Sequence, residues 1–232
     1  MFLFKTLKTS IQKVLLFLLL MASLGTASER QPEIQKTAFD AIKNNEVEVI
    51  RSLLIEGLDP NYKLGEPQNS MFIAVVYDRP EILQELLHAG GNVDHKLEGR
   101  MYFATYLAQK NNLQLLKPVL AQKPDLNKLM YVNQFTAFTG MLRFINEGTL
   151  KYVLNNSNVD VNFRPQNGLS SLYLAYERGK CGFRCVELLL EHGANPCLEI
   201  RSNKKSFLSY LEDSKSTNLI ENIKEYKCDK DV

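Results

Sequence analysis

Residues 168–196, GLSSLYLAYERGKCGFRCVELLLEHGANP, decide the fold of this 232-residue chain. The stretch reads as a short turn, a helix, a break at 180–182, a second helix and a His-Gly-Ala-Asn-Pro stop. Leu188 and Leu189 suit a packing face, and Gly193 suits a left-handed helix cap, since a residue without Cβ adopts positive φ at little cost. The stretch therefore predicts two packed helices closed by a glycine.

The end of the second helix recurs earlier in the chain. Gly57, Gly90 and Lys123 follow three apolar helix ends at intervals of 33 residues. A fixed period of this length indicates a repeat array. The Gly-x-Ser-Ser-Leu-Tyr-Leu-Ala start and the Val-Glu-Leu-Leu-Leu-Glu-His-Gly-Ala-Asn end of residues 168–196 closely resemble one ankyrin repeat.

The resemblance implies an all-α ankyrin-repeat solenoid of about five repeats with a C-terminal capping helix pair. The domain is expected over 33–228, with repeats at about 35–62, 69–95, 102–128, 135–163 and 168–197 and the cap at 203–228. Pro118 lies inside an expected second helix and predicts a kinked or shortened one. The family's histidine in the first helix is replaced throughout, so aromatic packing is expected instead of its hydrogen bonds between repeats. Its position holds Phe39, Phe72, Thr105, Phe138 and Tyr173.

Residues 1–27 have the pattern of a secretory signal peptide. Lys5, Lys8 and Lys13 precede an apolar run at 14–22, and Gly25 and Ala27 are the small residues of a cleavage site. We expect cleavage after Ala27 and no membrane association afterwards. The alternative is an uncleaved anchor, although the run has nine residues against the roughly 20 that span a bilayer. Loss of three lysines changes the formal charge from +2 to −1, which argues against a nucleic-acid partner.

All four cysteines lie in the last quarter of the chain. An exported protein permits disulfides. In the ankyrin arrangement Cys197 and Cys228 both follow second helices, at the hairpin end, whereas Cys181 and Cys185 both lie at the opposite end. We therefore predict the pairs Cys197–Cys228 and Cys181–Cys185.

Little in the sequence favours catalysis, a metal or a cofactor. His88 and His192 precede two helix-ending glycines, where a cation interacts favourably with the helix dipole. No cysteine or histidine lies at zinc-ligand spacing beside His95. Nucleophile elbows, phosphate-binding loops and H-E-x-x-H pairs do not occur. We expect no cofactor, no metal and no enzymatic activity.

Ankyrin arrays generally bind proteins through a concave face, made by the outer side of the first helices and the hairpin tips, and the resemblance transfers this face to the present chain. Several of its residues are too apolar for a face that meets only water, and Tyr and Arg commonly anchor interfaces. The alternative is that irregular repeats have shifted in register, so that some of these residues are buried. The candidate partner-binding residues are Ile73, Val76, Tyr77, Tyr106, Lys110, Leu142, Arg143 and Arg178.

The sequence thus predicts a monomeric, exported protein of the bacterial periplasm or the cell exterior that binds a protein partner. An immunity-type inhibitor and a scaffold are two versions of this role. The alternatives are a secreted effector directed at a host, and an enzyme with a cryptic site in the irregular third and fourth repeats.

Overall fold

The computed structural model describes residues 27–63, 69–94, 96–97, 101–130, 135–165, 168–200, 205–214, 220, 223, 226 and 228. The described residues form two compact units divided between Asn92 and Val93. The predicted signal peptide lies outside the described residues except for Ala27, which begins the first described helix.

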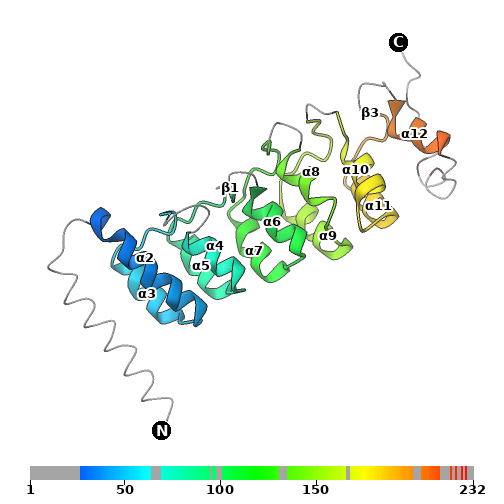
Figure 1. Cartoon of the computed structure of the whole chain (residues 1–232). Coiled ribbons are helices and arrows are strands. Elements are labelled where there is room, and N and C mark those ends of the chain that lie inside the picture. Colours follow the sequence, from blue (N-terminus) through cyan, green and yellow to red (C-terminus); the bar gives the residue numbers. More distant parts are fainter. Residues whose placement is uncertain are drawn as a thin grey trace, which may run out of the picture. The chain divides into compact units, whose positions relative to one another are not determined.

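The first unit consists of two helix pairs. Its helices are α2 (Ala27–Lys43), α3 (Val47–Ile55), α4 (Ser70–Val76) and α5 (Pro80–His88). Helix α2 packs against α3 and α4, and α5 packs against α4 and α3 (Figure 1). The first helix is much longer than the short segment at 38–42 that the repeat pattern predicts. Its inner face carries Gln31, Ile34, Gln35 and Ala38, all of them buried.

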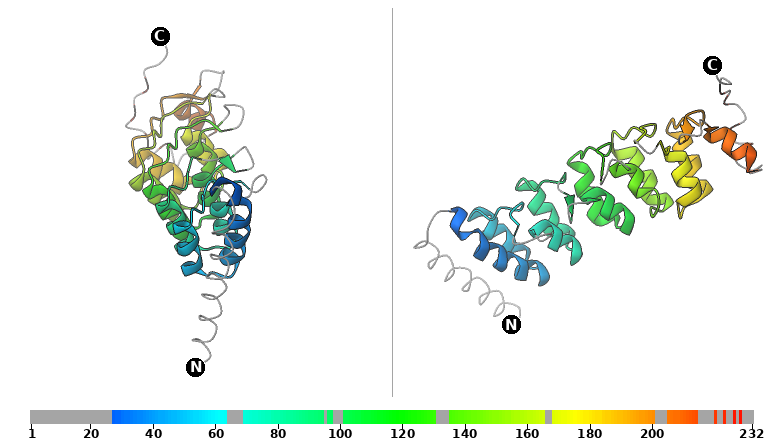
Figure 2. Two further views of the ribbon diagram at one scale, coloured as in Figure 1. Left: turned by 90° about the vertical axis from the view of Figure 1, so that its left-hand side faces the viewer. Right: turned by 45° about the horizontal axis from the view of Figure 1, so that its top comes forward.

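The second unit continues the same arrangement with three further pairs and a short final helix. The elements are β1 (Lys96–Leu97), β2 (Met101–Tyr102), α6 (Phe103–Lys110), α7 (Leu113–Ala121), α8 (Ala137–Met141), α9 (Glu147–Asn156), α10 (Ser171–Arg178), α11 (Phe183–Glu191), β3 (Glu199–Ile200), β4 (Lys205–Ser206) and α12 (Phe207–Asp213). Helix α6 packs on α7 and α8, and α11 packs on α9 and α10 (Figure 2). The strands form two antiparallel hairpins of two residues each. The all-α prediction is confirmed.

The proline in the third repeat does not shorten its helix. Helix α7 contains Pro118 and has nine residues, as α3 and α5 do. The predicted shortening therefore does not occur, while the alternative of a kink stays a prediction. Pro118 removes a single backbone donor, while Leu115, Leu116, Val119 and Leu120 are buried, so packing holds the helix.

The replaced histidine position behaves in two ways. Phe39 and Phe138 are buried, which agrees with the expected aromatic packing. Thr105, however, is also buried and donates its hydroxyl to the carbonyl of Ala137 at 2.8 Å. At this position a threonine hydroxyl therefore supplies a hydrogen bond to the next repeat in place of the family's histidine.

Asparagines join the loops of consecutive repeats. In the second unit the Oδ1 of Asn162 accepts a bond from the backbone N–H of Asn195 at 2.8 Å, and its Nδ2 donates to the carbonyl of Gly193 at 2.9 Å. Because one side chain bonds two backbone groups of the next repeat, it fixes the spacing of the pair. The same role falls to Asn61 with Asn92 and Gly90 in the first unit, and to Asn127 with Asp160 in the second.

Two disulfides stabilise the C-terminal end of the second unit. Cys181 pairs with Cys185 and Cys197 with Cys228, with Cα atoms 5.5 and 5.1 Å apart. Both predicted pairs are confirmed. Of the predicted capping pair, α12 forms the first helix, whereas the second, expected over 219–226, lies largely outside the described residues.

Candidate functional site

In the first unit the exposed apolar residues of the predicted surface lie at the end of α4. Val76 is 50% exposed and Tyr77 is 40% exposed. Ile73, by contrast, is 7% exposed, so its predicted place on the binding surface is wrong. The reason is that the short α4 packs against both α2 and α5, which leaves only its C-terminal end open.

In the second unit the end of α6 presents a cation beside an aromatic ring. Tyr106 is half-buried, and the exposed Lys110 holds its ammonium 5.6 Å from the Tyr106 ring centroid. Such a contact contributes about 0.5–1 kcal/mol at an exposed site. The pair lies one helical turn apart on α6, so the two predicted residues are in contact with each other.

The fourth repeat starts one residue later than a strict 33-residue period allows. Thr136 caps α8, whereas the cap of α6 is Tyr102, which would place the next cap at 135. Leu142 is consequently 0% exposed, so its predicted surface position is wrong. The shift in register moves the open positions to the exposed Arg143 and the half-buried Phe144.

Two cations meet at the Phe144 ring. The Arg143 guanidinium lies 5.4 Å from the ring centroid, and the ammonium of Lys180 lies 5.8 Å from it. Lys180 belongs to the turn between α10 and α11, so residues of two successive repeats contact one ring. The predicted residue Arg143 is therefore part of a cationic cluster that includes Lys180.

Helix α10 carries an aromatic cluster shared with the final helix. Tyr176 lies 5.8 Å from Phe183, 5.9 Å from Phe207 and 6.2 Å from Tyr210, and Tyr173 lies 5.3 Å from Tyr210, all between ring centroids. Phe207 is buried, but Phe183 is 50% exposed. The cluster joins α10 to α12 and leaves Phe183 open.

A shallow pocket opens beside this cluster. Tyr176, Glu177, Gly182 and Phe183 line it. The hydroxyl of Tyr210 donates a hydrogen bond to the Glu177 carboxylate, and this bond raises the pKa of the Tyr210 phenol well above its usual range. Glu177 is therefore already engaged by a donor of its own chain.

Two residues of the pocket lie in the loop that the Cys181–Cys185 disulfide closes. The Cys181–Cys185 bond encloses Gly182 and Phe183, and Gly182 takes a φ of +59° immediately before α11. A closed loop of this size restricts the first turn of α11, so Phe183 is held on the surface. Arg178 is the last residue of α10; its side chain lies outside the described part, and its predicted role stays a prediction.

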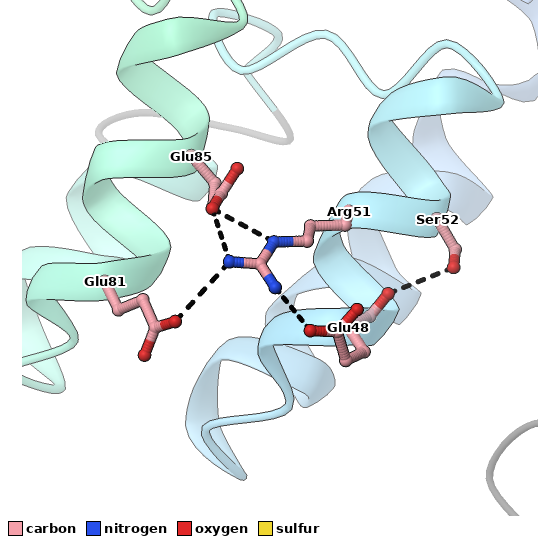
Figure 3. A network of polar contacts seen from close by, with 5 residues as sticks. All are labelled: Glu48, Arg51, Ser52, Glu81 and Glu85. Atoms are coloured by element: carbon pink, nitrogen blue, oxygen red, sulfur yellow. Dashed lines mark hydrogen bonds and ion pairs between the residues drawn. The ribbon is translucent and has the colours of Figure 1, made fainter.

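The second helices α3 and α11 carry ion networks. The guanidinium of Arg51 on α3 bonds Glu85 on α5 at 2.7 and 3.0 Å, lies 3.5 Å from Glu81, and also bonds Glu48 (Figure 3). Arg184 on α11 likewise bonds Glu147 on α9 and Glu187. The Arg51–Glu85 and Arg184–Glu147 pairs link neighbouring repeats, whereas Arg51–Glu48 and Arg184–Glu187 lie within one helix.

The two described histidines lie at the ends of second helices. His192 places Nδ1 2.8 Å from the carbonyl of Leu188 and Nε2 3.0 Å from Oδ1 of Asn155. His88 ends α5, and His95 lies outside the described residues. Within the described part, no group of three or more His, Cys, Asp or Glu side chains could hold a metal ion. No described helix is long and apolar enough to span a bilayer.

Comparison with known proteins agrees with this geometry. Residues 167–201 match the family model for the ankyrin repeat. A protein of Escherichia coli (strain K12) named as an ankyrin repeat protein, YahD, is 26% identical over 170 residues, which are 71% of this chain and 83% of the relative.

Two solved structures share the fold. An ankyrin repeat domain from Acinetobacter baumannii AYE matches with a TM-score of 0.68 at 19% identity, covering 80% of this chain and 94% of that one. The ankyrin repeat domain of Bcl-3, a member of the IkappaB protein family, matches with a TM-score of 0.69 at 18% identity, covering 80% and 83%.

Residues 167–201 therefore match an ankyrin repeat, and the described helix pairs and hairpins share the fold of these solved ankyrin repeat domains. Ankyrin repeats generally act as non-enzymatic modules for protein–protein interaction. The repeat at residues 167–201 accordingly implies a protein-binding module.

Proposed function

We propose that this protein is exported and binds its protein partner, without catalysis, at the C-terminal ends of its first helices. The observation that carries the proposal is the recurrence of exposed or half-buried aromatic residues on the first helices or directly after them. Tyr77 follows α4 and Phe144 follows α8, while Tyr106 and Tyr176 lie on α6 and α10. Aromatic side chains supply much of the binding energy of protein interfaces because they bury large apolar areas.

Export is proposed on two grounds. Residues 1–27 resemble a secretory leader, and every cysteine of the chain has a disulfide partner. Disulfides form and persist in oxidising compartments such as the periplasm and the cell exterior. Cell fractionation with a C-terminal tag tests this: a mature species that starts near Ser28 in the periplasm or medium supports export, and a full-length cytosolic species refutes it.

Binding is tested by site-specific photo-crosslinking in cells. A photoreactive residue replaces Tyr77 in one variant and Phe183 in another. The controls replace Gln84 on α5 and Gln114 on α7, which are exposed on second helices. The proposal expects one protein crosslinked at the first two positions and not at the controls, and the purified partner must then bind the purified wild type.

Crosslinking of that partner at Gln84 and Gln114 with equal yield would show that the binding surface is misplaced. The purified pair then separates the two proposed roles. An immunity-type inhibitor abolishes the activity of its partner at a one-to-one ratio, whereas a scaffold leaves that activity intact.

A further inference from the structure

The second unit presents cations that the ion pairs of the structure do not neutralise. Lys110, Arg143 and Lys180 are exposed. None of the salt bridges among the described residues involves them, whereas Arg51 and Arg184 each bond at least two carboxylates. Their contacts are with rings instead, which leave the positive charge uncompensated.

Arg143 and Lys180 form the centre of this charge. Both approach the Phe144 ring, from two different repeats, so two like charges are held in one neighbourhood. A carboxylate beside this ring would be attracted by both charges, and charge-assisted hydrogen bonds are about twice as strong as neutral ones.

The pocket described above, whose lining residues flank Lys180 in the sequence, offers apolar contacts in addition to this charge. Tyr176 and Phe183 line it, and the half-exposed Phe183 leaves a ring face open. The Glu177 carboxylate in the same pocket is bonded by Tyr210. Because the one carboxylate is engaged and the neighbouring Lys180 is positive, the pocket favours an uncharged apolar side chain over a cation.

From this arrangement we infer that the second unit binds an acidic segment of the protein partner. A carboxylate of that segment sits between Arg143 and Lys180, and an apolar or aromatic side chain next to it packs on Tyr176 and Phe183. The inference rests on the proposed function and adds the chemical class of the bound segment.

The test is fluorescence anisotropy with labelled decapeptides and the purified, oxidised protein at 50 mM salt. One peptide alternates glutamate with phenylalanine; a second replaces glutamate by lysine, and a third replaces phenylalanine by alanine. The first should bind, the lysine peptide should not, and the alanine peptide should bind more weakly. A labelled oligothymidylate serves as a nucleic-acid probe.

Two double variants of equal charge change decide the site. Arg143→Gln/Lys180→Gln should weaken binding of the glutamate–phenylalanine peptide at least about tenfold, as expected for the loss of bonds to a charged group. Lys117→Gln/Lys151→Gln removes two exposed cations near α7 and α9, one of which lies 5.5 Å from the Tyr152 ring, and should leave binding within about twofold. Phe183→Ala should abolish the preference for phenylalanine over alanine.

Equal weakening by both double variants, equal binding of the lysine peptide, or tighter binding of the oligothymidylate would overturn the inference. So would the absence of any binding by the glutamate–phenylalanine peptide. Crosslinking at Phe183 to a partner, together with no acidic-peptide binding, would remove this inference and leave the proposed function intact. Peptide binding without any crosslinked partner would do the reverse.

Discussion

Replacing Gln35 by methionine should destabilise the first unit. Gln35 is 0% exposed on α2. Its Nε2 donates to the carbonyl of Asp59, and its Oε1 accepts from the hydroxyl of Ser70 at 2.6 Å. One turn earlier, Gln31 bonds the carbonyl of Gly57 at 2.6 Å and the N–H of Asp59 at 3.2 Å. The two glutamines therefore connect α2 to the loop after α3 and to the start of α4.

The magnitude follows from the groups left without partners. Methionine has nearly the volume of glutamine, so no large cavity opens and the packing cost is small. The Ser70 hydroxyl loses its partner, whereas the Asp59 carbonyl keeps the bond from the N–H of Tyr62 at 3.2 Å. A buried polar group left unsatisfied costs about 1–3 kcal/mol, and we expect Gln35→Met to lower the free energy of unfolding by about this amount.

Urea unfolding followed by circular dichroism, with hydrogen exchange of peptides from residues 27–92, measures the effect and places it in the first unit. Ser70→Ala and Gln35→Met/Ser70→Ala complete a double-mutant cycle, in which a coupling of about 1 kcal/mol is expected for a direct hydrogen bond. A loss below about 0.5 kcal/mol for Gln35→Met, or additive single effects, would refute the assigned role of these bonds.

Three further substitutions test the fold. Pro118→Ala should raise the free energy of unfolding by about 1–3 kcal/mol, because α7 continues past Pro118 and gains a backbone donor; an unchanged urea midpoint would contradict this. Gly91→Ala should cost about 1–3 kcal/mol, since a Cβ there would lie 2.9 Å from the Leu86 carbonyl oxygen; a wild-type thermal midpoint would count against it. Cys197→Ser/Cys228→Ser opens a loop of sequence separation 31 and should cost about 2–4 kcal/mol, seen as faster proteolysis at the C-terminal end; equal proteolysis rates would be inconsistent.

The sequence predicted the repeat class because helix ends, periods and glycines are local signals. The 33-residue interval between Gly57 and Gly90 needs no tertiary information, and both glycines take positive φ in the structure. The cysteine pairs were predictable because the family arrangement places their backbones at matching ends.

The wrong predictions for Leu142 and for the length of α2 came from sequence patterns that do not follow the packing of the helices. Leu142 was assigned to the binding surface by counting a fixed period. The start of α8 is instead marked by Thr136 and Thr139, two threonines three residues apart that form a capping box. Gln31 and Gln35 are polar at core positions, so hydrophobic periodicity could not extend α2 back to them.

The aromatic pocket was missed for a different reason. Its residues belong to α10, the following turn and α12, and only folding brings Tyr176, Phe183 and Tyr210 together. The spacing of Tyr173 and Tyr176 on one face of α10 was the available sequence signal, but their partner on α12 lies more than thirty residues away.

The asparagine connections make the array extendable by gene duplication. Asn127 accepts from the N–H of Asp160, 33 positions later. If residues 128–162 were copied in tandem after Asn162, the copied Asp160 would follow Asn162 by the same 33 positions, and the copied asparagine would meet the loop at Gly193 as the original does now. Each inserted repeat would bring the asparagine that bonds it to the next repeat. The protein could therefore lengthen its binding surface by whole repeats without further mutations at the junction.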